Sequence, residues 1–399
     1  MENPSRPAMT TVFEATNIVS ALGLTTDEVF DNIRQGRTGL SLQSDLFDLP
    51  EPFMASLIDR ARLDEAFDRL HPPTWPDGAY TRFEQAAIVS SDDALRQTDI
   101  DPTTLRVRFF LSTTKGNVHL LDPRETAGHS ADQLYLWHTA YRIAHFFGNI
   151  TPPLVISNAC ISGAAALIAA RRELLAGRID TAIVIGADML SRFIVSGFQS
   201  FKALSPEPCR PFDADRMGLN LGEAASTVIL TRRAVNNLEP SDVLLTDGAI
   251  RNDANHISGP SRTGEGCFRA LRHILRNIPE ERLTDEIAFV NAHGTATPYN
   301  DEMESIALTR AALDRVPVNS LKGYLGHTLG AAGVLETILA AESLRAGIAL
   351  PTAGFRTLGV THPIRVTNAT APITARRCIK MLSGFGGCNA ALLVSLPDC

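Results

Sequence analysis

The length, composition and charge of the chain exclude several classes of protein. The sequence has 399 residues, of which 44% are hydrophobic and 20% are charged, so it contains enough apolar side chain to form a core and is not disordered. A net charge of −7 argues against a nucleic-acid binder, and no apolar run is long enough to span a bilayer. We expect a cytoplasmic protein with about two or three domains, or one large intertwined domain.

The predicted elements alternate between short β-rich runs and helical patterns. In chain order, the sequence predicts a strand at 106–111, a helix at 163–176, and further strands at 181–186 and 287–292. No low-complexity linker divides the chain. This alternation predicts a layered α/β architecture.

A faint internal symmetry accompanies this alternation. Residues 222–230 and 386–394 both consist of a glycine-led turn, small residues and an apolar run. Each segment closes roughly half of the chain. The pattern permits a duplicated α/β fold with an N-terminal half at 1–240 and a C-terminal half at 241–399.

One of the six cysteines has an unusual neighbourhood. Cys160 follows an apolar strand end and small residues, and it precedes an alanine-rich helical stretch. We expect the helix N-terminus to favour its thiolate. From this stretch alone, a nucleophile and a buried structural cysteine are equally good interpretations. The other cysteines form no Cys-x-x-Cys pair and are expected to be structural.

Two histidines lie in loops that contain glycine. His293 ends a predicted strand and precedes a Gly/Thr/Pro turn, in which Thr295 and Thr297 offer hydroxyls to a polar ligand. His327 lies in a glycine-rich loop that opens a helix. A lone histidine is usually a core or surface residue, but two such loops together with Cys160 predict a site. Neither loop has the spacing of a zinc motif, so we expect no metal.

A further loop, at residues 381–389, places Phe385 among glycines. In the simplest interpretation it is only a turn before the final strand. In a functional interpretation, its flexible backbone presents an N–H donor and lets the aromatic ring move as a gate.

Four motifs occur along the chain in the order found in one enzyme family. They are Ala159-Cys160, His293-Gly294-Thr295-x-Thr297-Pro298-x-x-Asp301, Lys322-x-x-x-x-His327-x-x-Gly330-Ala331-Ala332-Gly333 and Gly384-Phe385-Gly386-Gly387. Together they resemble the elongating β-ketoacyl-acyl-carrier-protein synthases of the thiolase superfamily. The resemblance covers nearly the whole chain and implies a thiolase-like, duplicated αβαβα layered fold, usually in a homodimer.

The resemblance also implies a role for each matching residue. Cys160 accepts an acyl group as a thioester, while His293 and His327 stabilise the enolate that forms when a malonyl group loses CO2. Lys322 is expected to supply charge near the histidines and to pair with Glu336, which is also expected to contact substrate. The remaining implied residues shape the oxyanion hole or contact substrate: Phe385, Gly384 and Gly386 in the glycine loop, and Thr295 and Thr297 on the phosphopantetheine arm.

The implied reaction is a decarboxylative Claisen condensation. An acyl thioester on Cys160 reacts with malonyl-acyl carrier protein to give β-ketoacyl-acyl carrier protein, CO2 and free carrier. The resemblance implies no resident cofactor, because phosphopantetheine arrives on the carrier protein.

One position departs from the pattern of primary fatty-acid enzymes. Lys115 falls where an apolar residue would line the acyl pocket, and a lysine beside an alkyl tail is costly. We therefore expect Lys115 to contact substrate in a pocket that is short, polar or reshaped by a partner. This favours polyketide, polyene or aryl-polyene synthesis over primary fatty-acid synthesis.

The expected partner is an acyl carrier protein, which is acidic and docks on basic residues. The candidates for this docking are Arg60, Arg62, Lys202 and Arg210. A homodimer is expected, and a heterodimer with a chain-length-factor-like subunit is a second possibility.

Related activities differ at identifiable residues. Degradative thiolases carry a second cysteine in the C-terminal glycine loop, where this chain has Phe385, although Cys388 lies nearby. Initiating synthases use an asparagine where this chain has His327. The alternative from another class is a non-catalytic chain-length-factor-like subunit, and the presence of Cys160 favours the enzyme.

Overall fold

The strands form one large mixed sheet. The computed structural model describes residues 8–44, 46–73, 78–253, 255–256 and 259–398. Within this part of the chain, eleven strands follow the order β13-β11-β10-β15-β16-β9-β1-β8-β6-β4-β5. Their bounds are β1 Met9–Ser20, β4 Val107–Ser112, β5 Leu154–Ile156, β6 Thr181–Asp188, β8 Ala224–Ala234, β9 Leu244–Asn252, β10 Ile287–Asn291, β11 Pro317–Asn319, β13 Arg365–Val366, β15 Arg377–Gly384 and β16 Cys388–Ser395.

The two ends of this order repeat one pattern. In the N-terminal part, β5, β4 and β6 are parallel, and β8 and β1 continue antiparallel. In the C-terminal part, β11, β10 and β15 are parallel, and β16 and β9 continue antiparallel. The two similar sequence segments became β8 and β16, which hold equivalent places. The division at residue 240 stays a prediction.

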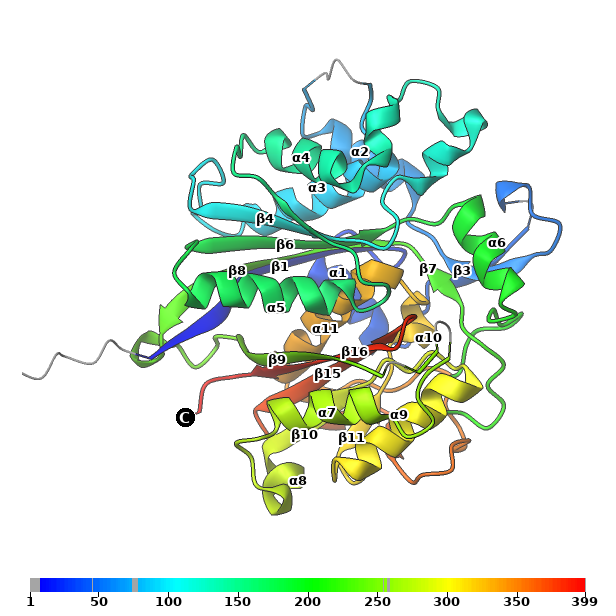
Figure 1. Cartoon of the computed structure of the whole chain (residues 1–399), viewed down its shortest axis with the longest axis vertical. Coiled ribbons are helices and arrows are strands. Elements are labelled where there is room, and N and C mark those ends of the chain that lie inside the picture. The colour runs from blue at the N-terminus through cyan, green and yellow to red at the C-terminus, as the bar shows by residue number, and fades with distance from the viewer. Residues whose placement is uncertain (1–7, 45, 74–77, 254, 257–258, 399) are drawn as a thin grey trace, which may run out of the picture.

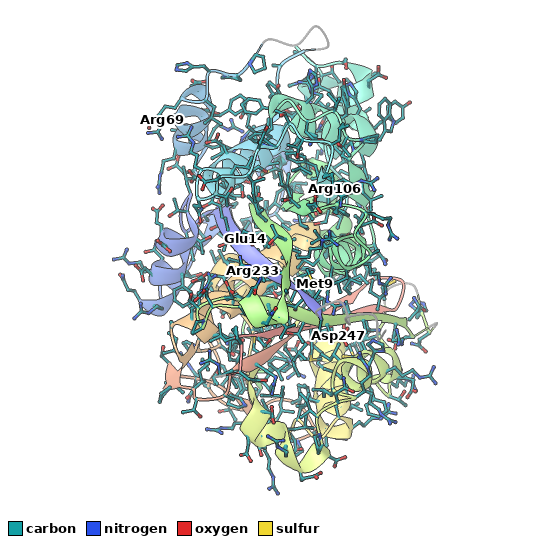
Figure 2. All side chains as sticks on the ribbon, turned by 90° about the vertical axis from the view of Figure 1, so that its left-hand side faces the viewer. Met9, Glu14, Arg69, Arg106, Arg233 and Asp247 are labelled. Atoms are coloured by element: carbon teal, nitrogen blue, oxygen red, sulfur yellow. The ribbon has the colours of Figure 1, made fainter. Side chains whose placement is uncertain are left out.

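Strand β1 joins the two parts. It pairs with β8 along most of its length and with β9 at Val12 and Leu244. Glu14 of β1 and Arg233 of β8 lie together on this side of the molecule (Figure 2), with 2.7 Å between their charged atoms. Arg233 also binds Asp242, which precedes β9, at 2.8 Å. These ion pairs fasten the junction.

Helices divide the molecule into five layers (Figure 1). Helices α3 (Arg82–Leu95) and α4 (Leu136–Phe146) cover one outer face, and α7 (Glu265–Ile274) and α9 (Pro298–Arg310) cover the other. Between the two parts of the sheet lie α5 (Ser162–Leu175) and α11 (Ala332–Arg345). The remaining helices are α1 (Thr26–Arg34), α2 (Arg60–Asp68), α6 (Arg192–Ser200), α8 (Leu283–Glu286) and α10 (Lys322–Leu325).

Smaller elements surround these layers. A three-stranded sheet comprises β2 (Leu40–Gln43), β3 (Phe53–Ser56) and β7 (Leu221–Gly222), and β12 (Ile348–Ala349) pairs with β14 (Ala371–Pro372). The short 3-10 helices are η1 Leu46–Asp48, η2 Val118–Leu121, η3 Pro123–Glu125, η4 Ala131–Leu134, η5 Val235–Asn237, η6 Glu280–Arg282 and η7 Leu329–Ala331. The strands and helix predicted from the sequence occur within one or two residues of their expected bounds.

The two central helices pack unusually closely. Helix α11 is apolar almost all round, as expected of a helix covered on every side. A Cβ atom added to Gly163 would lie 2.6 Å from the backbone nitrogen of Val334, and one added to Gly333 would lie 2.3 Å from that of Ala164. Only glycine fits at this crossing, which sets the distance between the N-terminal ends of both helices.

Among the helices formed by the described residues, none combines the length and apolarity needed to cross a membrane.

The crossing predicts that Gly163→Ala lowers the free energy of unfolding by about 3 kcal/mol, because the added methyl group meets rigid backbone atoms. The matched control is Gly197→Ala in α6, where an added Cβ meets no atom within 4 Å. That control is expected to be neutral or to stabilise by up to about 1 kcal/mol. Chemical denaturation of both variants measures the difference, and equal stabilities would contradict the crossing.

Candidate active site

Cys160 lies in a tight turn between β5 and α5. Ala159 has a positive φ of 45°, a strained backbone conformation for a residue other than glycine. The Ser162 hydroxyl donates to the Ala159 carbonyl at 2.6 Å and accepts from the Asn158 N–H at 2.8 Å, which closes the turn. The Cys160 side chain is thereby held at the start of the central helix, with the residue only 7% exposed.

His293 is held by the loop that follows β10. The backbone N–H groups of His293 and Gly294 both donate to the Glu304 carboxylate of α9, each at 2.7 Å. The Thr295 N–H donates to Asp301 at 3.1 Å. Among the described residues, Nδ1 of His293 is buried and has no hydrogen-bond partner.

His327 is held between α10 and η7. Its backbone N–H donates to the Asn220 carbonyl at 2.7 Å, and its own carbonyl accepts from Gly222 at 3.0 Å. The Leu329 N–H donates to Nδ1 of His327 at 3.3 Å. Because Nδ1 is an acceptor, the proton of the neutral ring is on Nε2, which remains a donor.

The fold brings these three residues together from distant parts of the chain. The sulfur of Cys160 and ring nitrogens of His293 and His327 all lie within 4.8 Å of one another. The two imidazole rings are 5.0 Å apart between centroids and nearly perpendicular. All three residues are buried, so a reacting group here is shielded from water.

Burial and nearby cations keep both histidines neutral. The pKa of His293 lies well below its usual value because of burial first, then the charge of Lys322, the other histidine and Lys380. The pKa of His327 is lowered by burial, Lys322 and Lys380. Both rings are therefore neutral hydrogen-bond donors at physiological pH.

The expectation of a stabilised thiolate at Cys160 is wrong for this arrangement. Burial raises the pKa of the thiol to about 11, and the carboxylate of Asp188 also raises it. The charges of Lys322 and Lys115 and a hydrogen bond from the Phe385 backbone lower it, but by less than burial raises it. Cys160 is thus a neutral thiol at rest, and its proton must leave when it is acylated.

Lys322 lies behind the histidines and is completely buried. Its ammonium group binds Oε1 of Glu336 on α11 at 2.8 Å, which is the pairing predicted from the sequence. A second buried lysine, Lys380 of β15, binds Oε2 of the same carboxylate. Neither Lys322 nor Glu336 lines the cavities beside Cys160, so Glu336 is placed as a support and not as a substrate contact.

Asp188, at the end of β6, connects three segments of the site. Its carboxylate accepts from the Thr113 hydroxyl at 2.7 Å, from the Thr114 N–H at 2.9 Å and from the Gly330 N–H at 2.6 Å. The end of β4 and the turn after His327 are therefore fixed to the same strand end.

Two cavities meet at Cys160. The first has a volume of about 600 Å³ and is lined by both histidines, Thr295 and Thr297. The hydroxyls of these threonines lie 2.8 Å apart. This cavity is placed to receive a polar arm that ends at the histidines.

The second cavity, of about 520 Å³, has four phenylalanines in its mainly apolar walls. Its lining consists of Thr114, Lys115, Ala159, Cys160, Phe193, Ile194, Ser196, Gly197, Phe198, Phe201, Leu329 and Phe385. Lys115 was expected at such a pocket and lies there, but a wholly polar pocket is not what the structure has. The cavity suits flat or aromatic groups.

Phe385 lies between the two cavities and lines both. Its ring centroid is 6.0 Å from that of Phe198 and 5.6 Å from that of Phe201. Gly384 packs against the turn of the nucleophile, because a Cβ there would lie 3.2 Å from the Cys160 nitrogen. Gly386 has a φ of 84° and lies in the same turn without lining either cavity.

The four basic residues predicted to dock a carrier lie in different environments. Lys202 is exposed and lines the first cavity. Arg210 pairs with Glu207 at 3.0 Å, and Arg62 pairs with Glu28 at 2.9 Å. Arg60 lines a separate cavity and not the one that contains Cys160.

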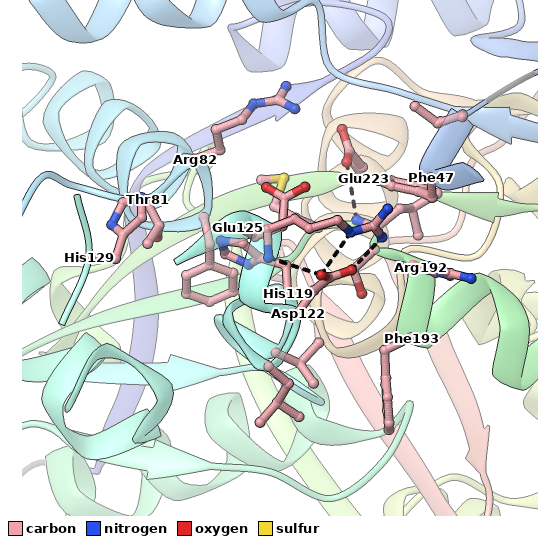
Figure 3. A pocket seen from close by; sticks show the side chains of 18 of the residues that line it. Phe47, Thr81, Arg82, His119, Asp122, Glu125, His129, Arg192, Phe193 and Glu223 are labelled. Atoms are coloured by element: carbon pink, nitrogen blue, oxygen red, sulfur yellow. Dashed lines mark hydrogen bonds and ion pairs between the residues drawn. The ribbon is translucent and has the colours of Figure 1, made fainter. Parts of the chain in front are cut away.

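That separate cavity is larger, about 1070 Å³, and contains none of the three central residues. It lies beside α6 (Figure 3), where Arg124 binds Asp122 and Asp48. Acidic and basic side chains both line it. Size alone therefore does not locate the chemistry, because no cysteine is among the residues that line this cavity.

The central residues also offer three donor atoms of kinds that zinc accepts. The sequence spacing gave no sign of this grouping, because it forms only in the folded chain. Lys322 acts electrostatically on the cysteine and on both histidines. The positive charge of Lys322 so close to these residues disfavours the binding of a metal cation. We therefore retain the expectation that the site holds no metal.

Sequence reasoning missed three supporting residues: Lys380, Glu304 and Asp188. Glu304 and Asp188 gave no signal, because acidic residues are common in this chain. The sequence did contain a signal for Lys380, because only four of the 37 basic residues are lysines. Lysine is rarely buried, so a lysine in a buried strand of this arginine-rich chain is exceptional.

Comparison with known proteins identifies the family. The family model described as β-ketoacyl synthase, N-terminal domain, matches residues 14–236, and the model of the C-terminal domain matches residues 244–356. The chain belongs to the β-ketoacyl synthase family. Its matches place it with condensing enzymes of the acyltransferase class, as the sequence motifs predicted.

Several relatives show the range of this family. The chain is 33% identical to nodulation protein E of Rhizobium leguminosarum bv. trifolii, over 63% of this chain and 64% of that protein. It is 27% identical to the tetracenomycin polyketide synthase ketoacyl synthase alpha subunit of Streptomyces glaucescens, over 94% of each.

A solved structure supports the fold. A chain of the complex of the ketosynthase ApeO with its chain length factor ApeC, from Xenorhabdus doucetiae, superposes with a TM-score of 0.86 and 26% identity. The match covers 99% of this chain and 100% of that chain. The predicted thiolase-like α/β fold is thus confirmed.

The neutral thiol predicts how alkylation of Cys160 depends on pH. Its rate with iodoacetamide should be low at pH 7 and rise about tenfold per pH unit up to pH ~9.5, because only the thiolate reacts. Peptide mapping by mass spectrometry measures the rate at this cysteine alone, and Cys160→Ala supplies the blank. A plateau below pH 8 would show a thiolate that the burial does not permit.

Proposed function

We propose that this protein catalyses the decarboxylative condensation of a Cys160-bound acyl group with malonyl-acyl carrier protein. The observation that carries the proposal is a buried cysteine within 4.8 Å of two neutral histidines, at the junction of two cavities. One cavity suits the growing acyl group and the other suits the phosphopantetheine arm. The proposed reaction needs the acyl group and the phosphopantetheine arm to meet at the Cys160 sulfur.

In the first half-reaction, the Cys160 sulfur attacks the thioester of an acyl carrier protein. The backbone N–H groups of Cys160 and Phe385 stabilise the oxyanion of the tetrahedral intermediate, and the carrier leaves as a free thiol. A backbone hydrogen bond from Phe385 is among the influences that lower the pKa of the Cys160 thiol. The thiol proton of Cys160 is transferred to the departing carrier sulfur as the new thioester forms.

In the second half-reaction, malonyl-carrier occupies the cavity lined by Thr295 and Thr297. Its thioester carbonyl accepts hydrogen bonds from His293 and His327, which stabilise the enolate left by loss of CO2. The enolate carbon then attacks the Cys160 thioester, the bond between the acyl carbon and the sulfur breaks, and β-ketoacyl-carrier is released. The Cys160 thiolate takes up a proton from water and returns to the thiol. No step requires a resident cofactor or metal.

The aromatic acyl cavity guides the choice of substrate. Phe193, Phe198, Phe201 and Phe385 favour flat, conjugated or aromatic acyl groups over long flexible alkyl chains, because stacked rings gain from planar contact. This supports type II polyketide or polyene synthesis, including aryl-polyenes, ahead of primary fatty-acid synthesis.

The proposed partners are an acyl carrier protein and a second ketosynthase-like subunit. Similar structures include ketosynthases in complex with a chain length factor or with an acyl-carrier protein. A role as a non-catalytic chain-length-factor-like subunit is the rival proposal, and retention of Cys160 and both histidines argues against it.

The reaction predicts a covalent acyl-enzyme. The purified protein is incubated with octanoyl, polyenoyl and aroyl carrier proteins and then with malonyl-carrier, and both proteins are analysed by mass spectrometry. We expect acylation at Cys160, strongest for polyenoyl or aroyl groups, followed by a β-ketoacyl product. Cys160→Ala should show neither.

Candidate chain-length-factor subunits are added in parallel reactions. Loading only in their presence would establish an obligate heterodimer. Absence of loading in every mixture would overturn the catalytic proposal in favour of the non-catalytic role.

Carrier docking predicts a separate effect at Lys202. Lys202→Glu places a negative charge at the mouth of the first cavity and should raise the KM for malonyl-carrier about tenfold, because the carrier is acidic. Arg210→Glu tests the second candidate, and Arg96→Glu, at the C-terminal cap of the outer helix α3, is the charge-matched control. Steady-state kinetics at low salt measure the KM of each variant for malonyl-carrier. An unchanged KM would show that the substituted residue is not part of the docking surface.

A further inference from the structure

All four lysines of the chain lie around one site. They are Lys115, Lys202, Lys322 and Lys380. Lys202 lines the first cavity and Lys115 the second, while Lys322 and Lys380 are buried behind the histidines. The proposed mechanism gives Lys380 no role, although the buried position of an ammonium group is costly.

The contacts of Lys380 point towards His293. Its ammonium group donates to the carbonyl of Ala292 at 3.1 Å and lies 3.5 Å from that of Asn291. These are the two residues before His293, at the end of β10. Lys380 also binds Oε2 of Glu336, so it ties α11 to the backbone that carries the histidine.

Lys322 and Lys380 share Glu336 but act on different groups. Lys322 influences the pKa of Cys160, His293 and His327. Lys380 influences both histidines but is not among the main influences on Cys160. Glu336 thus binds two lysines, and Glu304 of α9 is a second buried carboxyl group that interacts with both of them.

We propose that Lys380 is a positioning residue of the condensing centre, which anchors the end of β10 so that His293 meets the enolate formed by decarboxylation. This inference rests on the proposed function. Through its charge, Lys380 also disfavours protonation of the histidines. It acts on the decarboxylation half-reaction and leaves acylation of Cys160 unaffected.

Other titratable groups surround the histidines, some of them neutral at rest, and the test must hold them constant. They are Lys322 of α10, Glu304 and Asp301 of α9, Glu336 of α11 and the thiol of Cys160. Glu336 keeps Lys322 as its partner when Lys380 is replaced, so Lys380→Met leaves no unpaired buried carboxylate.

The experiment separates the two half-reactions in Lys380→Met and Lys322→Met. Decarboxylation of malonyl-carrier and acylation of Cys160 are each followed by mass spectrometry. Lys380→Met should lower kcat for decarboxylation between about tenfold and a hundredfold, because His293 is misplaced. Its KM for malonyl-carrier and its acylation rate should stay within about twofold of wild type. Lys322→Met should slow both half-reactions.

A second readout follows the histidine directly. In protein labelled with ¹³C-histidine, the His293 resonance of Lys380→Met should titrate at higher pH than in wild type, because a nearby positive charge is gone. Lys380→Gln serves if the methionine variant does not fold. Its amide still donates to Ala292, so it should retain more decarboxylation than Lys380→Met while showing the same titration.

Two outcomes would overturn the inference. One is wild-type decarboxylation in a folded Lys380 variant, and the other is an equal loss of acylation and decarboxylation, which indicates a merely structural role. If the wild-type protein itself does not decarboxylate malonyl-carrier, the proposed function fails. The His293 titration then still decides whether Lys380 acts on the histidine, and an unchanged titration would overturn that action.

Discussion

The close crossing of α5 and α11 at Gly163 and Gly333 is the constraint on which the site depends. Cys160 precedes one of these helices and His327 precedes the other, so the distance between the helices sets the distance between the two residues. The layers outside the helices bury this crossing and exclude water from it. Asp188 then fixes the turn after His327 to the strand that ends beside it.

Exclusion of water determines the charge state of the centre. Burial makes the thiol and both imidazole rings neutral, and it also makes each remaining charge strong at short range. Two lysines are tolerated there because Glu336 binds both, one at each oxygen. The site therefore combines neutral donors with two lysines held beside carboxyl groups, which suits a reaction whose negative charge develops at one carbonyl oxygen.

The two cavities beside Cys160 differ in the residues that line them. The threonine-lined cavity is polar at the histidines, and the cavity beyond Phe385 is aromatic. A side chain that lines both can respond to either occupant, which fits the gating role expected of this glycine loop. Lys115 lines this second cavity, so the departure in sequence falls at one of the two cavities beside Cys160.

The sequence by itself determined the fold class, the family and the central residues. Regular alternation of apolar and polar residues predicts strands and helices locally, and short motifs preserve Cys160, His293 and His327 at recognisable spacings. Lys380, Glu304 and Asp188 belong to no such motif, because their roles depend on contacts with segments far away in the chain. The sequence also predicted a thiolate from the helix N-terminus, whereas the structure has a neutral thiol. Only the tertiary structure decided this, because desolvation depends on everything packed around the sulfur.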